Sequence, residues 1–183
     1  SVETYLITGT SRGLGKDLAE HYIGMGKKII GISRSSEVIK NPAYTHFCVD
    51  ITKPDEVTKM FSAIRRSDNS TINVVINCAG LGSSSLVILE SAENIQNIVN
   101  TNIVAPLLIS RGAIKLMKKG KYGRIINIGS IHEKIEPIGG SIYSASKNAL
   151  ASISRVCAKE FYSFGVTVNT VGLSAYDTQM MRS

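Results

Sequence analysis

Six short runs of apolar and β-branched residues alternate with segments of helical periodicity along this chain, and this alternation limits the possible folds more than any other feature. Several runs are apolar at consecutive positions, which is typical of strands buried on both faces of a parallel sheet. Strand–helix–strand units with right-handed crossovers build a doubly wound α/β parallel sheet with helices on both faces. The predicted strands are Thr4–Thr8, Lys28–Ser33, Thr45–Val49, Ile72–Asn77, Arg124–Gly129 and Val166–Val171.

Helical patterns fill the intervals between these strands. One face of the first helix is marked by apolar residues at steps of four, four and three. These residues are Leu14, Leu18, Tyr22 and Met25. The segment Pro54–Arg66 begins with a proline, which is favoured in a first helical turn. Its apolar positions are Val57, Met60, Phe61 and Ile64. Longer helices are predicted over about Ser91–Lys119 and Ser141–Phe164, and residues 1–183 are predicted to form a single domain.

The first strand leads directly into the glycine-rich stretch TGTSRGLG, residues 8–15. Gly9 can turn sharply, Gly13 lets a phosphate approach the backbone, and Gly15 lets the helix pack close to the sheet. The pattern alone would also suit a tight strand–helix turn. Its position at the first strand–helix junction, where helix N–H groups face an anion, favours a dinucleotide. The predicted cofactor contacts in this turn are Gly9, Ser11, Arg12, Gly13, Leu14 and Gly15.

The second strand ends in Ser-Arg-Ser-Ser, residues 33–36, without the carboxylate that an NAD-binding sheet usually carries there. Arg34 offers a planar fork of donors for a ribose 2′-phosphate, and Arg12 can approach it from the other side. Two solvated surface arginines are the alternative interpretation. NADP(H) is therefore favoured over NAD(H) as the cofactor.

The formal net charge of +7 is spread along the chain, and its densest group, Lys115 to Lys121, fits a helix C-terminus. An anionic cofactor or substrate explains the excess more simply than nucleic acid, which is not a predicted partner. Three cysteines without CxxC spacing or a histidine cluster indicate neither a disulfide framework nor a metal site. Because no apolar run reaches the roughly 18 residues of a bilayer span, we predict a cytoplasmic protein without membrane contact.

The segment SIYSASKNAL places Tyr143 and Lys147 on one helix face, one turn apart. A free tyrosine has a pKa of about 10 and exchanges protons poorly near neutrality. An ammonium about 4 Å away would contribute roughly 4 kcal/mol of attraction to the phenolate at an effective dielectric of 20. The tyrosine pKa could then fall by up to about three units, less the effect of desolvation. The pair therefore predicts a tyrosine that works as a general acid or base.

In the order of these motifs the chain resembles the classical short-chain dehydrogenase/reductase family. The resemblance implies a Rossmann-type sheet with strand order 3-2-1-4-5-6. The resemblance covers essentially the whole sequence, and Ser130 precedes Tyr143 by thirteen residues, the usual family interval. The matching residues are Thr8, Gly9, Gly13, Gly15, Asp50, Asn77, Ala79, Gly80, Asn102, Ser130, Tyr143 and Lys147. Cys78 stands where many relatives have a second asparagine, and a small buried residue is the expected role there.

The resemblance implies a role for each matching position. Asp50 would bind the adenine amino group and Ile51 would donate its N–H. Thr178 would lie beside the nicotinamide carboxamide. The adenine ribose would be lined, and the end of the fourth strand steadied, by Asn77, Ala79 and Gly80. Tyr143 and Lys147 would also contact the cofactor, with Lys147 on the nicotinamide ribose.

Ser130 follows the fifth strand at its carboxyl end, where ligand sites of doubly wound sheets collect. Its hydroxyl can hold the substrate oxygen, and a capping serine is the alternative. Asn102 lies four residues before Pro106, whose missing N–H frees the Asn102 carbonyl. The family uses this asparagine in a water relay to the lysine; a buried asparagine at a local kink is a compatible alternative. The predicted catalytic residues are Asn102, Ser130, Tyr143 and Lys147.

Leu81 to Leu86, the residues after Ser130, and Ile135 to Ile138 are the expected pocket wall. His132 is expected to be a substrate contact or a loop residue rather than a general base. The predicted substrate contacts are Ser130, His132 and Tyr143. The positive charge would suit an acyl thioester on an acidic protein or on coenzyme A, and steroids, sugars and polyols stay open as substrates.

Two departures from the family pattern stand out. Leu173-Ser174 replaces the usual Pro-Gly after the sixth strand, and the sequence ends at Ser183, before the family's substrate lid and seventh strand. We expect these later parts to be missing from the chain. The two long helices would form a homodimer or homotetramer interface, as they do in the family.

The resemblance implies an NADP(H)-dependent oxidoreductase that interconverts a carbonyl and an alcohol by hydride transfer. A catalytically silent NADP-binding regulator or sensor is the alternative, and an epimerase or dehydratase is a third possibility. The complete Ser–Tyr–Lys–Asn set favours the oxidoreductase.

Overall fold

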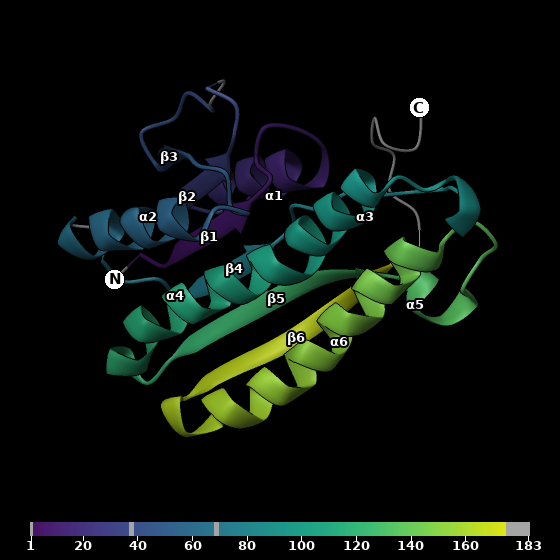
Figure 1. Ribbon diagram of the computed structural model, residues 1–183. Helices are drawn as coiled ribbons and strands as arrows, with labels where there is room; N and C mark the ends of the chain where they lie inside the picture. The colour runs from purple at the N-terminus through teal and green to yellow at the C-terminus, as the bar shows by residue number, and fades with distance from the viewer. Residues whose placement is uncertain (1, 37–38, 68–69, 175–183) are drawn as a thin grey trace.

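The computed structural model describes residues 2–36, 39–67 and 70–174. Six parallel strands form one sheet in the order β3-β2-β1-β4-β5-β6, which confirms the predicted Rossmann-type topology (Figure 1). The strands are β1 (Thr4–Thr8), β2 (Lys28–Ser33), β3 (Tyr44–Cys48), β4 (Val74–Asn77), β5 (Gly123–Ser130) and β6 (Val166–Leu173).

The strand bounds differ from the predicted ones where pairing extends a strand or shifts it. β1 and β2 match the prediction, β3 starts one residue earlier, and β4 starts two residues later. β6 continues to Leu173, which pairs with Ser130 at the end of β5. The N–H of Ile131 then donates to the Leu173 carbonyl at 3.0 Å. The first of the two residues that replace the family's Pro-Gly is therefore held in the sheet.

Helices cover both faces of the sheet, as predicted. Buried side chains of α2, α4 and α6 pack on one face around Leu6 and Ile125, while Ala19 of α1 packs on the other around Ile7. In Figure 1, α4 and α6 run side by side across the near face. The α-helices are α1 (Gly13–Gly24), α2 (Pro54–Arg66), α3 (Ala92–Val99), α4 (Ala105–Gly120), α5 (His132–Ile135) and α6 (Ser141–Phe161). Shorter helical segments are η1 (Val87–Leu89), η2 (Asn100–Val104) and η3 (Tyr162–Phe164).

The predicted apolar face of α1 needs one correction. Leu14, Leu18 and Tyr22 are half-buried, but Met25 is 57% exposed because it lies just past the last helical residue, at the C-cap. Ala19 is the side chain that is completely buried. The prediction for α2 was right in both its bounds and its four buried apolar residues.

The long helix predicted over Ser91–Lys119 is divided into α3, the π-helical segment η2 and α4. In η2 the N–H of Ala105 donates to the Asn100 carbonyl, five residues back. Pro106 cannot donate an N–H, so the chain widens by one residue at this point. This widening places Asn102 inside the fold, where it is 1% exposed.

In the parts of the chain that the structure describes, each helix is too short or too polar to cross a bilayer.

Candidate active site

The glycine turn between β1 and α1 is held against the ends of two other strands. Gly9 has φ +77°, and a Cβ at this position would approach the Ala79 Cα to 3.0 Å. A Cβ on Gly15 would overlap the carbonyl of Gly9, so α1 packs on its own entry turn. Thr8 Oγ1 accepts the N–H groups of Cys78 and Ala79, each at 3.0 Å. The backbone is thereby shaped into a cradle that only glycine permits.

The other predicted cofactor residues surround this cradle. Ser11, Arg12 and Arg34 are exposed. Leu14, Ile51, Ala79 and Gly80 are half-buried, and Gly13 adopts φ +54°. Thr178 lies outside the described residues. The described residues therefore line the carboxyl ends of β1, β2, β3 and β4, the edge at which doubly wound sheets bind dinucleotides.

Asp50 lies just after β3 and is kept ionised by its neighbours. Burial raises its pKa, but hydrogen bonds from Thr52 and the charge of Arg34 outweigh burial and lower the pKa. Asp50 Oδ1 accepts the Thr52 N–H at 3.0 Å and the Thr52 hydroxyl at 2.6 Å. The role of Thr52 was not predicted, although Asp-x-Thr is a sequence signal for this kind of local turn.

Tyr143 and Lys147 both lie in the first two turns of α6, beside β5. The Lys147 ammonium donates to the Ile128 carbonyl at 2.9 Å and lies 5.8 Å from the centroid of the Tyr143 ring. Lys147 is only 6% exposed. Burial lowers its pKa, while Cys78 and Glu133 act in the opposite direction. The structure thus brings a buried cation beside the phenol.

Asn102 connects three elements around this pair. Its Oδ1 accepts the Leu81 N–H at 2.8 Å, and its Nδ2 donates to the Leu81 carbonyl at 2.9 Å and to Ser146 Oγ at 3.0 Å. Ser146 in turn donates to the Tyr143 carbonyl at 2.7 Å. A Cβ on Gly80 would lie 3.5 Å from both Asn102 Oδ1 and Lys147 Nζ. The loop after β4 therefore meets α6 at the lysine, a contact in which Ser146 was not predicted.

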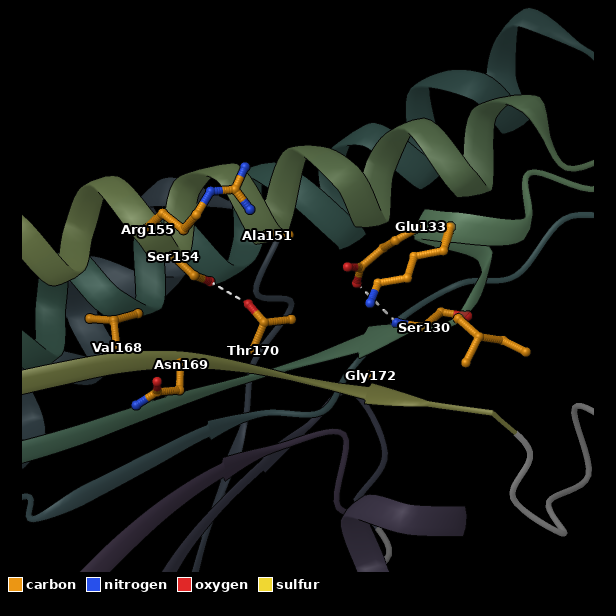
Figure 2. Close-up of a pocket in the computed structure, with 11 residues that line it drawn as sticks. Ser130, Glu133, Ala151, Ser154, Arg155, Val168, Asn169, Thr170 and Gly172 are labelled. Atoms are coloured by element: carbon orange, nitrogen blue, oxygen red, sulfur yellow. Dashed lines mark hydrogen bonds between the residues drawn. The ribbon is translucent and has the colours of Figure 1, made fainter.

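Ser130 is the last residue of β5 and lies one residue before the N-cap of α5, Ile131. Its Oγ accepts the His132 N–H at 3.2 Å. Its own N–H donates to Glu133 Oε1 at 3.1 Å (Figure 2). Ser-x-x-Glu is the sequence pattern of a capping box, and here the two bonds tie the end of β5 to the first turn of α5. The bond from His132 uses a lone pair of the hydroxyl, so it leaves the hydroxyl proton free to reach a substrate oxygen. The capping and substrate-binding interpretations are thus compatible, and Glu133 is a residue that the prediction missed.

His132 lies against Tyr143, with the two rings edge to face at 5.2 Å between centroids. Its Nδ1 is buried and has no hydrogen-bond partner within the part of the chain that the structure describes. The three predicted substrate contacts, Ser130, His132 and Tyr143, are therefore linked through His132.

A cavity of about 500 Å³ opens between α5, α6 and β6, on the flank of Ser130 (Figure 2). Its lining includes Ser130, Glu133, Arg155 and Thr170. Neither Tyr143 nor Lys147 is among the described residues that line it. Of the three predicted substrate contacts, all of which the structure describes, this cavity includes Ser130 alone.

A buried polar network fixes α6 on the sheet behind the site. Asn77 donates to Asn127, Asn127 donates to Ser154, and Thr170 also donates to Ser154, each at 2.8 Å. The first three of these residues are at most 3% exposed. Asn77 was predicted to line the adenine ribose and to steady the end of the fourth strand, and its side-chain amide holds the end of β4 in this network.

A strand order of 3-2-1-4-5-6 with a glycine turn at the first strand–helix junction is the arrangement of a dinucleotide-binding doubly wound fold. Residues 3–183 match the family model described as short chain dehydrogenase. The chain belongs to the short-chain dehydrogenase/reductase family, whose members oxidise CH–OH groups or reduce C=O groups with NAD(P).

The relatives agree with this assignment. The chain is 29% identical over 184 residues to the 3-oxoacyl-acyl-carrier-protein reductase FabG of Salmonella typhimurium, covering 97% of this chain and 75% of the relative. It is 27% identical to the aldohexose dehydrogenase structure of Thermoplasma acidophilum, with a TM-score of 0.91 and coverage of 99% and 69%. The structure of ElxO with NADP bound has a TM-score of 0.92 at 24% identity, with coverage of 100% and 77%, and supports the fold.

Proposed function

We propose that this protein is an NADP(H)-dependent reductase that converts a carbonyl into an alcohol with Tyr143 as the general acid. The observation that carries the proposal is the placement of Lys147, a cation 6% exposed beside the Tyr143 ring and bonded to a main-chain carbonyl. Burying a charge without a close carboxylate is unfavourable for stability. A cation kept in this position is best explained by its effect on the phenol.

Each residue has a chemical task in this reaction. When bound in the glycine cradle, NADPH supplies the hydride for the carbonyl carbon. Tyr143 donates its phenolic proton to the substrate oxygen, and the Lys147 ammonium stabilises the phenolate that results. Ser130 donates its hydroxyl proton in a hydrogen bond to the same oxygen as negative charge develops there. The reverse reaction uses the phenolate as the base.

The preference for NADPH rests on the charges at the ends of β1 and β2. Arg12 and Arg34 are both exposed there, and Ser33 to Ser36 include no carboxylate. A guanidinium binds a phosphate with two parallel hydrogen bonds, whereas a carboxylate at this position would repel the 2′-phosphate.

We favour an acyl thioester as the substrate. FabG, by its name, reduces the 3-oxoacyl group of acyl carrier protein. In the expected pocket wall, the Ser85 N–H donates to the carbonyl of Gly139, the residue that follows Ile135 to Ile138, at 2.8 Å. The wall exposes Leu86 at 49% and Ile138 at 93%. Apolar side chains suit an acyl chain better than a sugar, and the net charge of +7 suits an acidic carrier.

The test follows NADPH oxidation by absorbance with three carbonyl substrates: a 3-oxoacyl thioester, an aldose and a cyclic ketone. We expect the thioester to be reduced fastest, with NADPH preferred to NADH. Tight NADPH binding without turnover of any carbonyl would instead support the catalytically silent regulator. Faster reduction of the aldose or the cyclic ketone would refute the acyl assignment alone.

A further inference from the structure

A chain of hydrogen bonds connects the glycine turn to the turn that follows β2. Thr10 Oγ1 lies 2.8 Å from the Tyr44 hydroxyl, which lies 2.9 Å from His46 Nδ1. His46 Nε2 lies 2.9 Å from the Ser35 carbonyl, and the Ser33 hydroxyl donates to that carbonyl at 3.3 Å. Thr10 is 2% exposed, and Tyr44 and His46 are half-buried on β3.

The chemistry of these groups gives the chain a direction. A carbonyl oxygen only accepts hydrogen bonds, so His46 Nε2 must carry a hydrogen and donate a hydrogen bond to the Ser35 carbonyl. In the neutral imidazole Nδ1 is then the acceptor, and the Tyr44 hydroxyl donates to it. The Tyr44 hydroxyl oxygen in turn accepts a hydrogen bond from the Thr10 hydroxyl. Burial raises the pKa of Tyr44, so its hydroxyl keeps the proton that it donates to His46.

Packing fixes the same two side chains. Tyr44 and His46 lie on one face of β3, with their rings stacked at 5.9 Å between centroids. A Cβ on Gly31 would overlap the Tyr44 hydroxyl, so the glycine in β2 provides the space for the ring. His46 also pairs with Gly31 in the sheet register. The two rings therefore form a fixed brace across β2.

We propose that Tyr44 and His46 are positioning residues for recognition of the cofactor 2′-phosphate. They hold the Ser33–Ser36 turn, which carries Arg34, at a fixed place relative to the glycine turn, which carries Arg12. This inference rests on the proposed NADPH preference. Because the brace exists before the cofactor arrives, less ordering of the two arginine-bearing turns is needed on binding.

Loss of the brace should affect the binding of NADPH and of NADH differently. Only NADPH has the 2′-phosphate that requires both turns at once, whereas the pyrophosphate common to both cofactors needs the glycine turn alone. Loss of the brace should therefore weaken NADPH binding more than NADH binding. A general loss of stability would weaken both by the same factor.

The test measures dissociation constants for NADPH and NADH by fluorescence titration, with thermal unfolding as a check on folding. Tyr44→Phe keeps the ring and its packing on Gly31 but removes the hydroxyl. Two hydrogen bonds are lost, and we expect NADPH binding to weaken at least about fivefold and NADH binding less than twofold. His46→Leu should do the same. His46→Gln, which keeps a donor and an acceptor, should retain the preference for NADPH.

Phe47→Leu is the matched control, because Phe47 lies on the opposite face of β3 and packs into the other core cluster. It should change both dissociation constants equally. Equal effects of Tyr44→Phe on the two cofactors, or no effect, would overturn the inference. If Arg34→Asp abolishes the preference for NADPH while Tyr44→Phe leaves it intact, the cofactor assignment is supported and the proposed role of Tyr44 and His46 is refuted. A wild-type protein that prefers NADH would overturn both.

Discussion

Lys147 is a charged group in surroundings that disfavour its charge. Burial lowers its pKa below the ordinary lysine value, and the structure gives its ammonium a main-chain carbonyl as hydrogen-bond acceptor. Such a residue reduces stability in return for activity. In the proposed mechanism the charge is needed only when the neighbouring phenol gives up its proton.

Lys147→Met should separate these two effects. Turnover should fall at least ~100-fold, since the phenolate loses its counter-charge. The window of interest lies between the lowered pKa of Lys147 in the folded protein and its pKa in the unfolded chain. In this window the unfolded chain binds more protons, so the stability of the wild type should rise with pH. The methionine variant should lack this gain. Urea unfolding at neutral and alkaline pH measures the difference; a wild type that instead loses stability relative to the variant as pH rises would contradict the burial argument.

Cys78 illustrates a residue whose surroundings suppress reactivity. Burial raises its pKa to about 11, although the charge of Lys147 acts in the opposite direction. At pH 8 about one thiol in a thousand would be ionised, and the thiolate is the reactive form. We expect a maleimide to label exposed Cys48 first and Cys78 much more slowly, as read by mass spectrometry of peptides. Labelling of Cys78 at the rate of Cys48 would contradict its predicted role as an inert buried residue.

Among the strands and helices, the sequence predicted correctly those with a regular apolar pattern within the element itself. β1 and β2 have consecutive apolar residues, and α2 has a proline start with a regular apolar face, so their bounds were right. The helix α5 was missed because four residues carry too little periodicity, and the Ser-x-x-Glu pattern at its start was the only signal. The π-helical segment depends on the single residue Pro106, which indicated a kink but not its form.

Asn102 is the residue that ties this segment to its neighbours, so Asn102→Ala should destabilise the fold. Three hydrogen bonds would be lost, and both polar groups of the Leu81 peptide would lose a partner. We expect a loss of about 2 kcal/mol in the free energy of unfolding. Asn97→Ala, at an exposed position of α3, is the control. If Asn102→Ala lowers the free energy of unfolding no more than the control does, the hydrogen bonds of Asn102 contribute little to stability.

For the whole molecule, the doubly wound parallel sheet could be predicted from the alternation of strands and helices, and its strand order from the resemblance to the family. Contacts between distant segments could not be predicted. The Tyr44–His46 brace and the Asn77–Asn127–Ser154 network join residues from different strands through side chains that carry no local pattern. Such contacts depend on the register of the folded sheet.

The outer faces of α4 and α6 carry exposed apolar side chains. α4 and α6 lie side by side on one face (Figure 1), with Leu107 38% and Val156 50% exposed. We propose that these helices form the interface of a homodimer or homotetramer. The double variant Leu107→Glu/Val156→Glu should then have the mass of a single chain by light scattering, while Thr58→Glu on α2 should keep the wild-type mass. A wild type that is already monomeric would contradict the proposal.

The most direct test of the account is the turnover of Tyr143→Phe with NADPH and a 3-oxoacyl thioester. The substitution removes one hydroxyl and keeps the ring that packs against His132. We predict that turnover falls at least ~100-fold, the scale of general acid catalysis, while the dissociation constant for NADPH stays within about twofold of the wild-type value. A variant that turns over at close to the wild-type rate would contradict the assignment of Tyr143 as the proton donor.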